Sequence, residues 1–226
     1  MSEITNRVKE VLSSVPQNKY GEKVTLVAAV KFRTVEEIQE AIDAGIEAIG
    51  DNHVQEFKEK FDSIRGASRQ FIGHLQTNKV KYLIGKTDLI QSLDRMELVE
   101  ELDKRSVRAG VVTNVLVQVN IGCEESKGGF EYGEALERAR EIHARAGLNV
   151  KGFMAMLPIS DDEGYLSSLV EKMRSLYDAY REENGSAEYL SMGMSGDWKL
   201  CVEHGSNMIR IGTALFGARP VAKKDG

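Results

Sequence analysis

Short apolar runs alternate with amphipathic, charge-rich stretches along the whole chain. Each of the first seven apolar runs is followed by a helical pattern, and one more helical pattern precedes the first run. Strands that alternate with helices in this way are typical of a parallel sheet covered by helices. The eight runs are centred on Leu26-Val27, Ala48-Ile49, Phe71-Ile72, Leu89-Ile90, Val115–Val119, Phe153–Ala155, Tyr189-Leu190 and Met208–Ile211.

Start and stop signals mark several of the predicted helices. Thr34 and Glu37 have the spacing of a capping box, and Gly45 is placed to end the helix that they begin. The other helices are predicted over about 4–14, 133–145 and 165–183, with one that begins at Met96 and ends before Gly110 and a short one over 198–204.

The eight strand–helix units follow one another without a linker or a low-complexity segment. They predict an α/β fold with a single (β/α)8 barrel, one domain over residues 1–226, preceded by a helix within 1–15 and followed by a tail over 221–226. A doubly wound sheet is the alternative. Such a sheet usually has a glycine-rich phosphate loop after its first strand, and Lys31-Phe32-Arg33-Thr34 is not one.

Composition narrows the class of partner. The 226 residues are 42% hydrophobic and 29% charged, with a formal net charge of −5, which argues against nucleic acid or an anionic membrane as the main partner. No apolar run has the length of a membrane span, and the first residues do not resemble a signal peptide. The two cysteines lie far apart and no histidine–carboxylate spacing suggests a metal site, so we expect a cytoplasmic protein without a metal.

The first apolar run ends on a lysine. Lys31 follows Val24–Val30, a pattern that predicts a buried strand. An ammonium group at the end of such a strand costs free energy unless it is paired or serves a function. Desolvated lysines serve proteins as amine nucleophiles in Schiff-base formation. The alternative is a lysine that extends its charged head into solvent.

The ends of the seventh and eighth strands are small, hydroxyl-bearing and interrupted by glycine. In a (β/α)8 barrel these two strand ends are the usual phosphate site. They contain Ser195-Gly196 and Gly212-Thr213, each before a predicted helix, where exposed N–H groups and hydroxyls bind phosphate. The alternative is that Ser195 or Asp197 only caps the following helix.

Three further residues are placed near this end of the barrel. Arg210 alternates onto the inner or upper face, where a guanidinium needs a partner, and a salt bridge to Asp51 is one possibility for it. His74 follows the third strand and is a candidate for lining the site. Met154 and Met156 are expected to pack inside the barrel, with Met156 also reaching the rim of the site.

A lysine at one strand end and phosphate loops at two others suggest a ligand that is both an aldehyde and a phosphate ester. Pyridoxal 5′-phosphate has both groups. An aldolase-type barrel that forms a Schiff base with a sugar phosphate also fits this pattern.

The chain closely resembles the YggS/PROSC family of pyridoxal-phosphate-binding proteins, the pyridoxal phosphate homeostasis proteins. The resemblance extends to about Arg219, and its most specific pieces are His-Leu-Gln-x-Asn-Lys and Ser-Met-Gly-Met-Ser. The matching segments are Ala28–Lys31, Gly50–Glu56, Phe71–Lys79, Ser126–Gly129, Gly152–Met156, Leu190–Asp197 and Arg210–Gly217.

The resemblance implies the barrel of fold type III pyridoxal-phosphate enzymes, with Lys31 forming an internal aldimine with the cofactor. It also implies which residues hold the phosphate. These are Ser195 with the nearby main chain of Met194 and Gly196, and Gly212 and Thr213.

The same resemblance assigns the ring contacts. Arg210 would face the pyridine nitrogen, and Asn52 and His74 would line the ring. Asp51 and His53 depart from the residues that are commoner in the family, and the contacts affected by these departures lie at the rim of the site.

Alanine racemases carry an additional C-terminal β-domain with a second catalytic residue, and we expect none in this chain, which ends at Gly226. The resemblance therefore implies a monomeric carrier without catalytic residues, which buffers pyridoxal phosphate or delivers it to pyridoxal-phosphate-dependent apo-enzymes. A racemase-like enzyme is the alternative within the same cofactor class.

Overall fold

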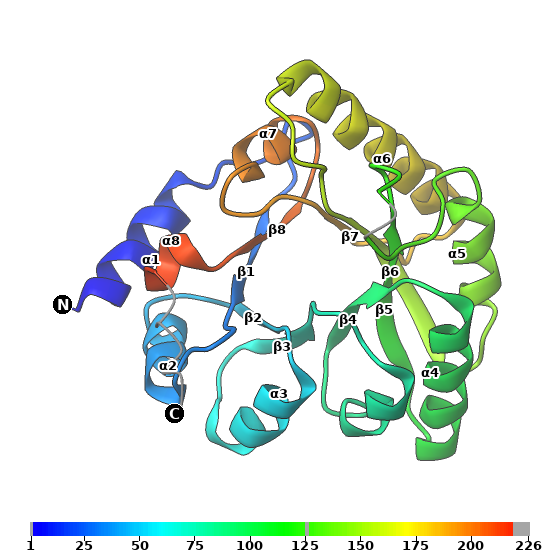
Figure 1. The fold of residues 1–226 in the computed structure, drawn as a ribbon, viewed down its shortest axis with the longest axis horizontal. Helices are drawn as coiled ribbons and strands as arrows, with labels where there is room; N and C mark the ends of the chain where they lie inside the picture. The colour runs from blue at the N-terminus through cyan, green and yellow to red at the C-terminus, as the bar shows by residue number, and fades with distance from the viewer. Residues whose placement is uncertain (1, 125–126, 219–226) are drawn as a thin grey trace, which may run out of the picture.

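In a computed structural model, which describes residues 2–124 and 127–218, the chain forms a closed barrel of eight parallel strands (Figure 1). Each strand pairs with the next along the chain, and β8 pairs with β1 to close the ring. The predicted (β/α)8 barrel is confirmed, because every predicted apolar run supplies one strand. The strands are β1 Thr25–Ala29, β2 Ala48–Asp51, β3 Ser68–Phe71, β4 Leu89–Leu93, β5 Thr113–Val119, β6 Leu148–Ala155, β7 Tyr189–Ser191 and β8 Met208–Ile211.

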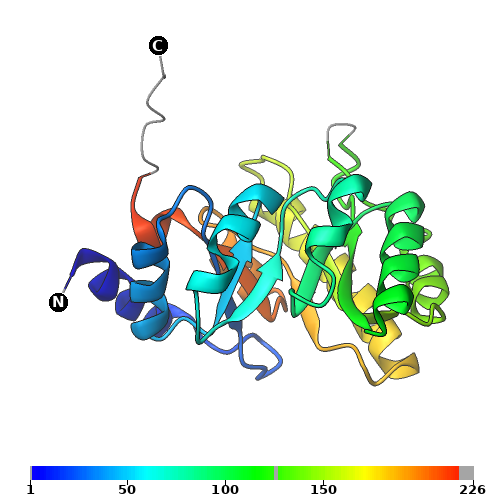
Figure 2. The same cartoon turned by 90° about the horizontal axis from the view of Figure 1, so that it is seen from below.

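Helices surround the barrel and run along its strands, as the side view shows (Figure 2). A helix follows each of the first seven strands, as predicted, but the one after β3 is η2, a 3₁₀ helix with Val80 as its one buried residue. The α-helices are α1 Glu3–Ser14, α2 Val35–Asp43, α3 Val54–Lys60, α4 Met96–Ala109, α5 Ala135–His143, α6 Glu163–Glu183, α7 Trp198–Glu203 and α8 Thr213–Phe216, and the 3₁₀ helices are η1 Phe61–Ser63 and η2 Thr77–Tyr82.

The predicted capping box is present at the start of α2. The hydroxyl of Thr34 accepts the N–H of Glu37 at 3.2 Å, and the Glu37 carboxylate accepts the N–H of Thr34 at 2.8 Å. Both otherwise unpaired main-chain donors are thereby satisfied.

A glycine ends helix α4. Gly110 has a φ of 67° there, a conformation that glycine adopts without a side-chain penalty.

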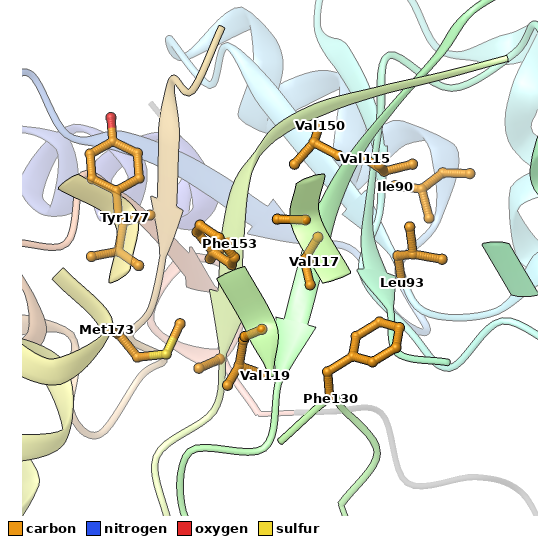
Figure 3. Packing of buried hydrophobic residues seen from close by; sticks show 14 of the residues in the cluster. Ile90, Leu93, Val115, Val117, Val119, Phe130, Val150, Phe153, Met173 and Tyr177 are labelled. Atoms are coloured by element: carbon orange, nitrogen blue, oxygen red, sulfur yellow. The ribbon is translucent and has the colours of Figure 1, made fainter. Parts of the chain in front are cut away.

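Apolar side chains fill the space between the strands and the outer helices (Figure 3). Val117 and Phe153 of neighbouring strands, for example, share one cluster with Tyr177 of α6. A separate cluster fills the barrel itself, and Met154 belongs to it while Met156 packs against it, as predicted. Its buried members are Val27, Ala48, Leu89, Leu116, Met154 and Met208.

The predicted N-terminal helix is α1, which lies outside the barrel beside α2 and α8 (Figure 1). Val8 of α1 is buried in a cluster with Ile38 of α2 and Leu215 of α8. The predicted tail over 221–226 lies outside the described residues.

The described residues contain neither a candidate membrane span nor a candidate metal cluster. In 2–124 and 127–218, no helix has the length and hydrophobicity that crossing a membrane requires. In the same two segments, histidine, cysteine and carboxylate side chains do not gather in groups of three or more that could hold a metal ion.

Candidate functional site

A cavity of about 230 Å³, here called the mouth cavity, opens at the carboxyl ends of the strands. Eight of the ten predicted site residues line it, whereas Gly196 and His74 do not. Ala29, Arg33 and Ile72 also line it and were not predicted. The eight are Lys31, Asn52, Met156, Met194, Ser195, Arg210, Gly212 and Thr213.

Lys31 reaches this cavity from a turn rather than from the strand itself. β1 ends at Ala29, and the N–H of Arg33 donates to the carbonyl oxygen of Val30 at 3.1 Å, which closes the turn. Lys31 is half-buried and makes no ion pair or hydrogen bond with any described residue. Its Nζ lies 4.8 Å from the ring centroid of Phe32. The ammonium group is therefore available to a ligand in the cavity.

Arg210 lies buried inside the barrel end with 6% of its surface exposed. Nη1 donates to the carbonyl oxygen of Ser191 at 3.0 Å, and Nη2 donates to that of Ala155 at 3.1 Å. Burial lowers the pKa of Arg210 to about 10, so it is still a cation at neutral pH. The possible salt bridge to Asp51 is not formed, because Asp51 pairs with Arg69 at 3.2 Å.

A chain of buried polar side chains supports Arg210 from within the barrel. Its Nη1 also donates to the hydroxyl of Ser191, which in turn donates to Oε1 of Gln91 at 2.7 Å. Nε2 of Gln91 donates to Oε1 of Gln70 at 2.6 Å. Sequence reasoning missed this chain, although single polar residues within otherwise apolar strands are a signal for it.

The loop after β7 presents unpaired donors to the mouth cavity. Oδ1 of Asp197 accepts the N–H of Met194 at 2.6 Å. The start of α7 has no side-chain cap, so the predicted capping by Asp197 or Ser195 is not present. The hydroxyl and N–H of Ser195 and the N–H of Gly196 have no hydrogen-bond partner in the described part of the chain. Gly196 adjoins the cavity-lining Ser195 without lining the cavity itself.

The turn from β8 into α8 presents a second set of donors. Within the described residues, the N–H groups of Thr213 and Ala214 and the Thr213 hydroxyl have no hydrogen-bond partner. Arg33 holds the other end of α8, because its Nη2 donates to the carbonyl oxygen of Gly217 at 2.7 Å. A Cβ at Gly212 would lie 3.2 Å from the carbonyl oxygen of Ala29, so a larger residue would crowd β1.

Together these groups give the mouth cavity a chemistry that suits an anion that also carries an electrophile. Lys31, Arg33 and Arg210 bring positive charge, and no carboxylate lines the cavity. The two loops add hydroxyl and N–H donors, which suit the oxygens of a phosphate group. The amine of Lys31 is the one nucleophile of this lining that forms a Schiff base with an aldehyde.

His74 lies apart from the mouth cavity. It lines a neighbouring cavity of about 440 Å³, and Asn52 lines both. Nδ1 of His74 is 3.2 Å from Oδ2 of Asp94, and 66% of the histidine side chain is exposed. The segment after β3 that carries His74 passes very close to Asn52, because a Cβ on Gly73 would lie 2.0 Å from the Asn52 carbonyl oxygen. The exposed His53 also lines the second cavity.

Comparison with known proteins identifies the class to which this fold and site belong. A family model described as "Alanine racemase, N-terminal domain" matches residues 4–220. A pyridoxal phosphate homeostasis protein of Aquifex aeolicus is 37% identical to the chain over 222 residues, which cover 97% of this chain and 96% of that protein. The chain belongs to the alanine racemase N-terminal domain family and, within it, to the pyridoxal phosphate homeostasis proteins.

Solved structures agree with this membership. An unknown protein from Bifidobacterium adolescentis is 31% identical, with a TM-score of 0.89 over 95% of this chain and 94% of that one. PipY of Synechococcus elongatus PCC7942, solved with PLP bound, is 26% identical. Its TM-score is 0.82 over 95% of this chain and 100% of that one.

Proposed function

We propose that the protein binds pyridoxal 5′-phosphate in the mouth cavity, with a covalent imine (an aldimine) between the cofactor aldehyde and Nζ of Lys31. The observation that carries this proposal is the unpaired Lys31 amine facing the same cavity as the buried cation of Arg210. The structural relative PipY, which was solved with PLP bound, supports it.

The two loops would hold the phosphate group. Ser195 and Thr213 each offer a hydroxyl without a partner among the described residues. The unpaired N–H groups beside them are further donors for the phosphate oxygens. Gly196 contributes through its main chain rather than by lining the cavity. Because the N–H of Met194 already donates to Asp197, Met194 contributes contact at the rim instead of a donor.

Arg210 would face the pyridine nitrogen, with Asn52 and Met156 lining the ring. Both of these residues line the mouth cavity together with Arg210. His74 lies in the neighbouring cavity, so its contact with the ring is proposed at the ring edge, on the side of Asn52.

The role that we infer is intracellular pyridoxal phosphate homeostasis. The protein would act as a cytoplasmic monomer that buffers the cofactor or delivers it to pyridoxal-phosphate-dependent apo-enzymes, without catalysing a reaction of its own. The relatives named pyridoxal phosphate homeostasis proteins support this role.

Absorption spectroscopy and borohydride reduction test the proposal. Protein mixed with pyridoxal phosphate should show the imine band, and reduction followed by peptide mapping should place the pyridoxyl group on Lys31. Lys79 and Lys127 serve as internal controls, because neither lines the mouth cavity. An adduct chiefly on either of them would refute the assignment, and the absence of an imine band would favour an aldolase-type barrel.

A further inference from the structure

The turn that carries Lys31 has an unusual main-chain conformation. Phe32 has a φ of 63°, and among the described residues only Cys123 shares a positive φ without being glycine. Side chains other than glycine, asparagine and aspartate rarely adopt this region, because Cβ approaches the neighbouring carbonyl oxygen. A bulky residue therefore keeps this conformation only where its surroundings impose it.

Glu56 contacts this turn from another element. Helix α3, which carries Glu56, lies outside the barrel beside β2 (Figure 1). Oε2 of Glu56 accepts the N–H of Phe32 at 2.9 Å and also the ammonium group of Lys60 at 2.9 Å. With 19% of its side chain exposed, Glu56 is largely shielded from water, which would otherwise compete for the Phe32 N–H.

The charge of Glu56 is maintained at neutral pH. Burial alone raises the pKa of this carboxyl group, but the hydrogen bonds from Lys60 and from the Phe32 N–H outweigh burial and bring the pKa below its usual value. An ionised acceptor makes a stronger hydrogen bond than a neutral one. The clamp on Phe32 is therefore charge-assisted.

The conformation of Phe32 is coupled to the position of Lys31. The two residues share the turn closed between Val30 and Arg33, and the Lys31 ammonium lies 4.8 Å from the centre of the Phe32 ring. The planar peptide between the two residues is flanked by ψ of Lys31 and φ of Phe32, so a change in the φ of Phe32 alters the path of the turn that carries Lys31.

We propose that Glu56 is a positioning residue for Lys31: by accepting the Phe32 N–H, it holds the turn in the form that directs the Lys31 amine into the mouth cavity. Glu56 does not line that cavity, so it acts through the main chain and not on the ligand. This inference rests on the proposed imine at Lys31.

The test compares two ligands that differ only in their ability to react with Lys31. Pyridoxal 5′-phosphate forms the imine, whereas 4′-deoxypyridoxine 5′-phosphate has a methyl group in place of the aldehyde. Glu56→Ala should raise the Kd of pyridoxal phosphate at least about tenfold and change that of the deoxy analogue less than about twofold. Imine absorbance measures the first Kd and calorimetry the second.

Two rescue variants distinguish positioning from general stabilisation. Glu56→Gln keeps an oxygen acceptor without the charge, so its Kd should lie between those of the wild type and Glu56→Ala. Adding Phe32→Gly to Glu56→Ala should recover most of the lost imine, because glycine adopts a positive φ without the clamp. Glu59→Ala is the matched control on the same helix, since among the described residues the Glu59 carboxylate accepts a hydrogen bond only from Gln55.

Each outcome is decisive. Equal losses for both ligands, or no loss with Glu56→Ala, would overturn the inference while leaving the proposed function intact. A wild-type protein that binds the analogue but forms no imine would overturn both. If Glu56→Ala does not fold, Glu56→Asp carries the same test, because its shorter side chain keeps the charge but withdraws from the Phe32 N–H.

Discussion

Nη1 of Arg210 donates both to the main-chain carbonyl oxygen of Ser191, at 3.0 Å, and to the hydroxyl of the same residue. The guanidinium is thus held by neutral oxygens and forms no ion pair with a described carboxylate, although Asp197 acts on its charge without touching it. A buried cation in this position is costly unless a bound ligand compensates it. The arrangement favours an electron-rich ligand atom, such as a pyridine nitrogen, as the missing partner.

The polar chain behind Arg210 should contribute measurably to stability. Gln91→Leu leaves Ser191 and Gln70 without their partner in a buried site, and each unsatisfied group costs about 1–3 kcal/mol. We expect the free energy of unfolding, measured with urea, to fall by roughly 2–4 kcal/mol. The exposed glutamine Gln55, changed to Leu, should alter it by less than about 0.5 kcal/mol. A similar small change for both variants would show that the chain is not a supporting element.

The phosphate loops should discriminate between phosphorylated and unphosphorylated ligands. Replacing Ser195 and Thr213 together by alanine removes two hydroxyl donors, and hydrogen bonds to charged groups contribute about 1.5–3 kcal/mol each. The Kd of pyridoxal 5′-phosphate should therefore rise more than about a hundredfold, while that of pyridoxal should change little. Ser168→Ala, on the exposed side of α6, is the control. Equal losses for the two ligands would contradict a phosphate role.

The barrel itself could be predicted because its signals are local and repeated. Each strand is a short apolar run between helical patterns, and the capping box of Thr34 and Glu37 needs only residues three positions apart. The strand ends could be located from the same pattern, which is why most predicted site residues line one cavity.

Contacts between distant segments could not be predicted in the same way. The close approach of Gly73 to Asn52 and the position of His74 in the neighbouring cavity depend on how two loops cross. The partner of Asp51 proved to be Arg69, because these residues lie on neighbouring strands and point to the same side of the sheet. The sequence alone does not show which of several arginines pairs with a buried carboxylate, because the choice depends on how the strands align.

Glu22 should make stability depend on pH. Burial raises the pKa of Glu22, but hydrogen bonds from Arg174 and Asn18 outweigh it, so the pKa lies below its usual value of 4.5. The ionised carboxylate accepts Arg174 at 2.6 Å and Arg181 at 2.8 Å. A lowered pKa in the folded state contributes stability above the ordinary pKa, and that stability is lost as the pH falls through the folded pKa.

Urea unfolding of Glu22→Gln checks this expectation. At pH 7 the variant should be less stable than the wild type by roughly 1.5–3 kcal/mol, because hydrogen bonds to a charged acceptor are lost. The difference should shrink as the pH falls below 4.5 and through the lowered pKa of the folded state, where the wild-type carboxylate also becomes protonated. Glu47→Gln is the control, since Glu47 forms an exposed pair with Lys23. A difference that is independent of pH would contradict the role of the Glu22 charge.

The bound cofactor should be catalytically quiet. A cation beside the pyridine nitrogen lowers the pKa of that nitrogen, and an unprotonated ring is a poor acceptor for the electrons of a substrate carbanion. Racemisation also needs bases on both faces of the substrate. Among the described residues that line the mouth cavity, Lys31 is the one side chain that could accept a proton, and His74 lies in the neighbouring cavity.

Exchange of the α-proton of an amino acid into deuterated solvent measures this property directly. With L-alanine, L-serine or L-lysine, the holo-protein should exchange the α-proton no faster than free pyridoxal phosphate does, because abstraction and electron withdrawal are both weak. Lys31→Ala provides the baseline, since it removes the proposed imine and the base together. Rapid exchange in the wild type that disappears in Lys31→Ala would show that the mouth cavity is an active site, with Lys31 as its catalytic base.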